Sequence, residues 1–170
     1  IDSVKLLADE YNIKMIQSSV IPLDKSKQKK IFEINKAACS WFHENLFSRN
    51  NTHILKYLDK RHIKIDDINN FKIGYAEFDG VLLIKHLLDL GYNLEEITES
   101  GIAVDKNNKQ VCRFRNRIIF PIRNIYGDTI AFGGRVVSDN DMPKYLNSPE
   151  TLVFKKKMAF YLNKARIQVF

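Results

Sequence analysis

In the first half of the chain, apolar residues recur every three or four positions. The longest such pattern predicts an amphipathic helix from about residue 27 to residue 47, with an apolar face formed by Ile31, Ile34, Ala38, Trp41, Phe42 and Leu46. Shorter patterns predict helices over residues 3–12, 52–61, 66–71, 80–91 and 94–101, and a short strand over residues 71–76. Thr52 and Asn93 are the expected N-caps, and Gly91 and Gly101 the expected stops.

After Gly101 the pattern changes to short apolar runs rich in β-branched and aromatic residues. Residues 117–122 and 129–137 predict an antiparallel hairpin with its turn at residues 124–128. Pro121 cannot donate a hydrogen bond to a neighbouring strand, so its strand is expected to be an edge or to end there. Residues 163–170 again look helical. We therefore expect an α+β fold, in which a helical first half packs with a mainly antiparallel, β-rich and basic second half.

The composition is that of a folded domain. The chain has 170 residues, of which 45% are hydrophobic, and no apolar run approaches the roughly 20 residues that a membrane span needs. The amphipathic, acid-containing start predicts no signal peptide. The lack of an initiator methionine indicates a piece of a longer protein, and a clipped tag is the alternative. Cys39 and Cys112 belong to no Cys-x-x-Cys pair, which favours buried free thiols in a reducing cytoplasm over a zinc site.

Positive charge is concentrated at one end of the chain. The formal net charge is +7, yet residues 101–170 alone hold 13 Lys and Arg against 5 Asp and Glu, a net of +8. Such a concentration is typical of proteins that bind a partner rich in phosphates. A solvated basic face is the alternative, and charge alone does not separate the two.

Two clusters in this basic region are candidates for binding anions. Arg113, Arg115 and Arg117 alternate, so on a strand they share one face, where their guanidinium groups suit phosphate oxygens. Pairing of these arginines with acids from the first half is the alternative. Gly133 and Gly134 interrupt a strand pattern just before Arg135, which indicates a bulge or the close approach of a backbone or ligand.

The segment 143–151, "PKYLNSPET", reads as a stiff polar loop. Prolines restrict it at both ends, which lowers the entropy lost when it holds a ligand. Lys144 offers a charge for a phosphate, Tyr145 an aromatic face for a base, and Asn147 and Ser148 directional hydrogen bonds. Turns often contain these residue types, so the spacing alone is a weak signal.

Other basic residues extend the charge, again with plain alternatives. Lys155, Lys156 and Lys157 suit phosphates or simply aid solubility. Lys60 and Arg61 end a predicted helix, where cations also favour the helix dipole.

Residues able to hold a catalytic metal are not grouped in this sequence. The acids of the second half are scattered over predicted turns, and only Asp139 and Asp141 lie close together, in a loop that makes them weak candidates. The histidines form no ligand-spaced pair with an acid, and no Gly-x-x-x-x-Gly-Lys phosphate loop is present. We expect no metal site in this chain.

The basic motifs together resemble a known family. "RFRNRIIFPIRNIYGDTIAFGGRVV" followed by "PKYLNSPETLVFKK" is similar to the core of bacterial replicative DNA primases of the DnaG type, and "YLDKRHI" and "FKIGYA" resemble upstream family segments. His62 stands where the family usually has glycine. The resemblance implies that residues 1–26 are the end of a zinc-binding module or its linker. Residues 27–170 would be the N-terminal subdomain of the polymerase core, with the Toprim, zinc-ribbon and helicase-binding parts elsewhere.

The resemblance also implies a function, residue roles and partners. The full enzyme would be a cytoplasmic nucleotidyltransferase that synthesises short RNA primers on single-stranded DNA. It would use Mg²⁺ or Mn²⁺ held by the Toprim part and Zn²⁺ held by the zinc module. Its partners would be the template, NTPs, the primer duplex and the replicative helicase. Here the residues implied at NTPs and template are Arg113, Arg115, Lys144, Tyr145 and Asn147. Those implied at single-stranded DNA are Lys60, Arg61 and Arg135.

The resemblance implies no catalytic residue within this chain, because the metal-binding carboxylates of the Toprim part are expected beyond Phe170. By itself the chain is therefore expected to bind single-stranded DNA weakly and to polymerise nothing. A non-catalytic single-strand-binding module and a purely structural domain with a basic surface are the rival hypotheses.

Overall fold

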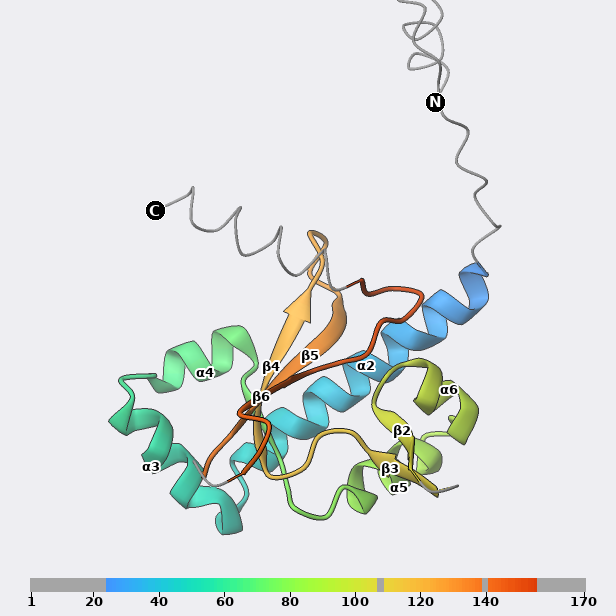
Figure 1. The fold of residues 1–170 in the computed structure, drawn as a ribbon. Coiled ribbons are helices and arrows are strands. Elements are labelled where there is room, and N and C mark those ends of the chain that lie inside the picture. The colour runs from blue at the N-terminus through green and yellow to red at the C-terminus, as the bar shows by residue number, and fades with distance from the viewer. Residues whose placement is uncertain (1–23, 107–108, 139–140, 156–170) are drawn as a thin grey trace, which may run out of the picture.

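The computed structural model describes residues 24–106, 109–138 and 141–155. Helices surround a four-stranded antiparallel sheet in the order β1-β4-β5-β6, and a separate two-stranded sheet pairs β2 with β3 (Figure 1). The α+β prediction is confirmed. The helices expected at 3–12 and 163–170 lie outside the described residues. No helix in the described ranges is long and apolar enough to cross a membrane.

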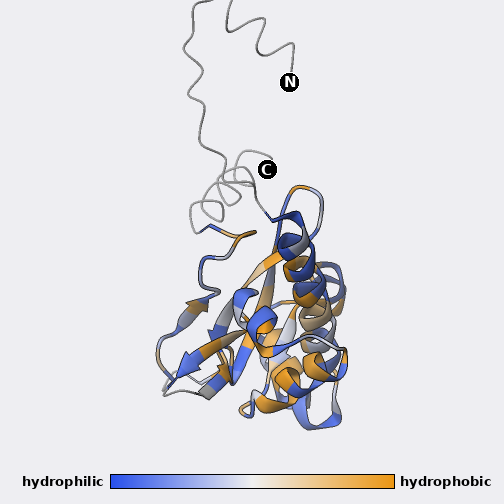
Figure 2. Cartoon of the chain, turned by 90° about the vertical axis from the view of Figure 1, so that its right-hand side faces the viewer, coloured by the Kyte–Doolittle hydropathy of each residue, from blue (hydrophilic) through white to orange (hydrophobic). Residues whose placement is uncertain are grey.

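Helix α2, Lys25–Leu46, is the predicted long helix and starts two residues earlier than expected. The earlier start comes from Asp24, whose carboxylate accepts hydrogen bonds from the backbone N–H groups of Ser26 and Lys27. The buried face of α2 consists of Ile31, Ile34, Asn35, Ala38, Cys39, Phe42 and Leu46. Figure 2 shows hydrophilic and hydrophobic stretches within the same helices, as expected for elements packed on one side.

The shorter helices also form where they are predicted, with one wrong cap. They are α3 (Thr52–Lys60), α4 (Ile65–Phe71), α5 (Val81–Asp89) and α6 (Leu94–Glu99). Asn93 caps α6 with a capping box, as expected. Thr52 is not a cap, because Asn51 takes that position and its side-chain amide donates to Asn45 O and Ser48 Oγ instead. Gly91 and Gly101 adopt φ of +90° and +81°, which explains why glycine ends these segments.

The predicted hairpin is present as β4 (Arg117–Arg123) and β5 (Thr129–Val136). Strand β4 neither ends at Pro121 nor is an edge strand, because β1 (Gly74–Ala76) pairs with its first residues. That pairing stops at Ile119, so Pro121 has only β5 beside it among the described strands. The β2 (Ala103–Lys106) and β3 (Lys109–Cys112) hairpin was not predicted, because its sequence lacks an apolar run.

The core lies on both faces of the main sheet. On one face, Phe42 of α2 meets Phe114 and Phe132 at ring-centroid distances of 6.4 Å and 5.5 Å, in edge-to-face geometry. On the other face, α3 and α4 cover Tyr75 and Ile118 near β1. Residue Tyr57 of α3 also reaches Arg135 of β5 on this side of the sheet.

Both cysteines are free and buried, as expected. Burial raises the pKa of the Cys112 thiol to about 11 and also raises that of Cys39.

Candidate nucleic-acid interface

The segment predicted as a stiff loop contains a strand. Tyr145–Asn147 form β6, an edge strand that pairs antiparallel with β5. Arg135 lies opposite Tyr145, and Gly133 lies opposite Asn147. Because opposed residues share a face and side chains alternate along a strand, Arg135, Tyr145 and Asn147 lie on one face. We call the exposed face formed by these three residues and the adjoining end of α3 the basic wall.

The end of α3 contributes Tyr57, which links two arginines of the basic wall. Arg135 Nη1 donates a hydrogen bond to Tyr57 Oη, and the Arg61 guanidinium lies 4.8 Å from the centroid of the same ring. The Arg135 guanidinium also lies 5.9 Å from the centroid of Tyr145. Thus α3, β5 and β6 are joined at one point by two cations and two tyrosine rings.

Arg135 remains a full positive charge in this setting. Burial acts to lower its pKa, but hydrogen bonds with Tyr145 and Tyr57 outweigh that effect, so the pKa is raised. Tyr57 was missed by the sequence analysis, although it lies one helical turn before Arg61, which was singled out. That spacing is the signal that would have found it.

Arg113 also reaches the basic wall, from the other side of β6. Its Nε donates to the backbone oxygen of Asn147 at 2.7 Å, so its guanidinium lies beside that strand. The side chain is half-buried, and burial lowers its pKa. Arg113 therefore braces β6 and has further N–H groups for another acceptor.

The prediction that Arg113, Arg115 and Arg117 share one strand face is wrong. Strand β3 ends at Cys112 and β4 begins at Arg117, and Asn116 between them has a positive φ of 51°. The chain therefore turns within the motif. Arg117 is buried and donates to Pro143 O at 2.8 Å, while Arg115 is exposed.

The pairing of these arginines with acids, the alternative hypothesis, is not seen either. Within the described ranges, every ion pair uses a lysine and none an arginine. Instead of acids, backbone carbonyl oxygens of β6 and its preceding loop accept the hydrogen bonds of Arg113 and Arg117. A carbonyl carries no net charge, so it leaves the charge of Arg113 uncompensated. At Arg117, burial lowers the pKa and the negative charge of Asp141 acts to raise it.

The remaining predicted residues differ in their exposure and in their partners. Lys144 and Lys60 are exposed, next to Tyr145 and Arg61 respectively. Lys155 pairs with Glu150 at 3.7 Å, and Lys156 and Lys157 lie outside the described residues. Ser148 is buried and its Oγ accepts from the backbone N–H of Phe132, so it holds the fold and is not free for a ligand.

The two glycines of β5 confirm a close approach and not a bulge. The register is regular at both, and the irregularity falls between Ile122 and Arg123. A Cβ on Gly134 would lie 2.9 Å from Phe114 Cδ1, and one on Gly133 would lie 3.3 Å from Asn147 Oδ1. The absence of a side chain at Gly134 thus leaves room for the ring of Phe114. In the same way, Gly133 leaves room for the side chain of Asn147 in the basic wall.

A polar network at the turn between β3 and β4 was not predicted. Tyr75 Oη donates to Asn116 Oδ1, and Asn116 Nδ2 donates to Asp141 Oδ2, both at 2.8 Å. Asp141 is thereby engaged in holding a turn, and Asp139 lies outside the described residues.

Metal-binding carboxylates were expected only beyond Phe170. Across the described ranges, no group of three or more His, Cys, Asp or Glu side chains is placed to hold a metal ion. Phe170 itself lies outside the described residues, which end at Lys155. The position of the catalytic carboxylates beyond Phe170 therefore stays a prediction from the family resemblance.

Comparison with known proteins identifies a matching family and similar sequences. Residues 41–166 match the model of the DNA primase catalytic core, N-terminal domain. The DNA primase of Clostridium acetobutylicum is 40% identical over 163 residues, which are 95% of this chain and 27% of that protein. The DNA primase of Listeria monocytogenes is 34% identical and covers 98% of this chain and 28% of its own length. The chain thus spans about a quarter of the length of these relatives.

Solved structures agree in fold. A DnaG primase catalytic domain bound to single-stranded DNA has a TM-score of 0.70 and 34% identity, with 77% of this chain and 41% of that chain covered. The RNA polymerase domain of Mycobacterium tuberculosis primase DnaG, in complex with a double-stranded DNA oligomer with an overhang, gives a TM-score of 0.71 at 31% identity, over 75% of this chain and 40% of that one. The chain therefore belongs to the family of the DNA primase catalytic core, N-terminal domain.

Proposed function

We propose that this chain forms the nucleic-acid-binding wall of a DNA primase that synthesises short RNA primers on single-stranded DNA. One observation carries the proposal: Arg61 and Arg135 meet on Tyr57 beside the exposed ring of Tyr145, and no described acid pairs with either arginine. Uncompensated guanidinium groups beside an accessible aromatic ring suit a phosphate backbone and an unpaired base.

The residues in and around the basic wall would bind different parts of the nucleic acid and the nucleotide. Arg61, Arg135 and the neighbouring Lys60 would neutralise template phosphates, while Tyr145 would stack on a base. Arg113, Arg115, Lys144 and Asn147 would contact the triphosphate of an incoming NTP or the template. Catalytic carboxylates in another part of the enzyme would hold divalent metal ions, which stabilise charge during nucleotidyl transfer.

The wider setting is proposed from the family resemblance. Zinc in a separate N-terminal module, a primer duplex and a replicative helicase bound elsewhere would complete the enzyme, in the bacterial cytoplasm. A structure of the Aquifex aeolicus primase that contains zinc-binding and RNA polymerase domains is among the similar ones, at 28% identity.

The test is single-stranded DNA binding by the 170-residue chain at several salt concentrations, followed by fluorescence anisotropy. We expect the logarithm of the affinity to fall linearly with the logarithm of salt concentration, and Arg135→Gln to reduce the slope by about 0.7. Lys144→Gln should weaken competition by NTPs. The matched control is Lys85→Gln, since Lys85 is exposed on α5, away from β5 and β6.

The outcomes separate the rival functions. Equal binding by Lys144→Gln, Arg135→Gln and Lys85→Gln would favour a structural domain. Binding without NTP competition would favour a non-catalytic single-strand-binding module. Primer synthesis by this chain alone, with Mg²⁺ and NTPs, would show that the catalytic groups lie within it and contradict the proposed division of labour.

A further inference from the structure

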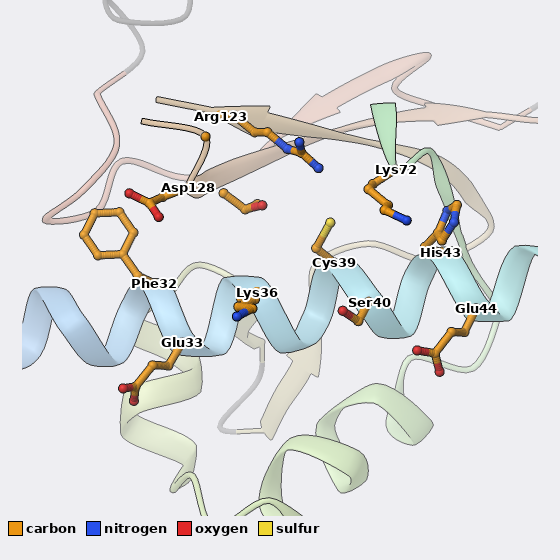
Figure 3. A pocket seen from close by; sticks show the side chains of 12 residues that line it. Phe32, Glu33, Lys36, Cys39, Ser40, His43, Glu44, Lys72, Arg123 and Asp128 are labelled. Carbon is orange, nitrogen blue, oxygen red and sulfur yellow. The ribbon is translucent and has the colours of Figure 1, made fainter. Parts of the chain in front are cut away.

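A second candidate site lies between α2 and the far end of the β4–β5 hairpin. It is a pocket of about 460 Å³, lined by residues of α2, by Lys72 after α4 and by the hairpin around its turn (Figure 3). Strand β5 connects the two sites, from Thr129 in the pocket to Arg135 in the basic wall, a span of roughly 20 Å at the usual rise per residue. No residue of the basic wall lines the pocket.

Three cations line the pocket from three separate elements: Lys36 of α2, Lys72 at the C-cap of α4, and Arg123 at the end of β4. No described acid forms an ion pair with any of them. Figure 3 shows Arg123 and Lys72 extending into the space above the part of α2 that carries Cys39. Like charges that line one pocket repel each other, and an anion bound among them relieves that repulsion.

The acids at the pocket do not neutralise these cations. Glu33 pairs with Lys29 at 3.9 Å, and Asp128 Oδ2 accepts a hydrogen bond from Asn124 within the hairpin turn. Figure 3 shows Glu33 and Glu44 directed below α2, away from the space between the helix and the hairpin. Asp128 lies above α2 at the end of the pocket near Phe32 (Figure 3), so the positive part of the pocket is the end that holds Arg123 and Lys72.

Uncharged groups complete a surface suited to phosphates. Ser40 and Thr129 line the pocket and offer hydroxyl donors. His43 Nδ1 lies 2.8 Å from Ile73 O, so this nitrogen is the donor and the ring is held in place. Phe32 lies at the opposite end of the pocket from His43 (Figure 3) and offers an apolar face.

We propose that this pocket binds a small phosphate-bearing molecule of mononucleotide size, with its phosphates among Lys36, Lys72 and Arg123 and its ring toward Phe32. The volume falls within the range of small-molecule sites. Guanidinium and ammonium groups together with hydroxyl donors match phosphate oxygens. The site is independent of the function proposed for the basic wall.

The test is a titration of the 170-residue chain with ATP, followed by backbone amide NMR shifts and calorimetry. A Lys144→Gln background removes a cation proposed to contact NTPs at the basic wall. We expect saturable shifts at Ser40 and Thr129. The Lys72→Gln/Arg123→Gln double variant should weaken this binding at least about tenfold, because two charge-assisted contacts are lost. Lys85→Gln is the matched control and should bind normally.

Two results would overturn the proposal: ATP shifts at Ser40 and Thr129 that persist unchanged in the double variant, or no shifts there at any ATP concentration. Displacement of ATP from these residues by a single-stranded oligonucleotide would also overturn it, since the phosphates would then be those of nucleic acid. Oligonucleotide binding by the double variant, measured alongside, reports on the basic wall. A failure of one site is thus distinguishable from a failure of the other.

Discussion

At the scale of single residues, Tyr57 has the largest consequence for the basic wall. Its hydroxyl accepts from Arg135 and its ring underlies Arg61, so one side chain positions two cations. Both guanidinium groups contact neutral partners, the hydroxyl and the ring of Tyr57. Tyr57 is therefore a positioning residue, while the arginines are the groups proposed to meet phosphate.

We predict that Tyr57→Phe weakens binding of single-stranded DNA roughly threefold, because Arg135 loses one hydrogen bond while the ring under Arg61 remains. The salt dependence should stay unchanged, since no charge is removed. Anisotropy titrations at two salt concentrations measure both quantities. Tyr126→Phe, in the exposed hairpin turn, is the control. A changed slope, or wild-type affinity, in Tyr57→Phe would contradict the positioning role.

At the scale of elements, the contact between α2 and β1 depends on a missing side chain. A Cβ at Gly74 would lie 2.5 Å from the backbone carbon of Phe42, a distance that real structures essentially never show. The helix and strand can approach this closely only because position 74 is glycine. This contact places Phe42 against Phe114 and Phe132 in the aromatic cluster under the sheet.

Gly74→Ala should lower the free energy of unfolding by about 1–3 kcal/mol, because α2 and β1 must move apart. Urea denaturation followed by circular dichroism measures the change. Gly133→Ala is the control within the same sheet, since its Cβ would meet only the Asn147 side-chain oxygen, at 3.3 Å, and Phe120 O, at 4.0 Å. An equal or larger loss in Gly133→Ala would show that the α2–β1 approach is not the sensitive contact.

At the scale of the whole molecule, α2 connects all three hydrophobic clusters of the described residues. Ile31 belongs to the cluster with Phe154, Phe42 to the central cluster, and Leu46 to the cluster under α3 and α4. A single helix shared by three clusters couples their stabilities. The described part of the chain should therefore unfold as one cooperative unit.

Ile31→Ala tests this coupling from one end of α2. It should lower the free energy of unfolding by about 2–5 kcal/mol, as expected for a fully buried isoleucine. Trp41 fluorescence and far-ultraviolet circular dichroism should still report the same urea midpoint. A separate, earlier transition seen by one probe alone would mean that the cluster of Ile31 unfolds independently.

The sequence predicted the helices and the central hairpin well because each carries its own local signal. Helix α2 has a long apolar face, α6 has its Asn93 cap, and β4 and β5 are rich in β-branched residues. The β2–β3 hairpin and β6 were missed because these short strands carry no apolar run of their own and form by pairing with a neighbour.

The sequence named candidate site residues but did not predict how they are arranged. Motif resemblance singled out Arg61, Arg113, Arg135, Tyr145 and Asn147, and the structure brings them around β6. Their roles at nucleotide and template remain predictions.

The sequence by itself determined the order of the helices and the central hairpin, the excess of positive charge after residue 100 and the membership of a primase family, because these depend on local periodicity, composition and motifs. Only the tertiary structure decided that the arginines after β3 diverge, that Ser148 is buried, and that Tyr57 joins Arg61 to Arg135. Those outcomes depend on which distant strands and helices pack together, and no short stretch of sequence contains that information.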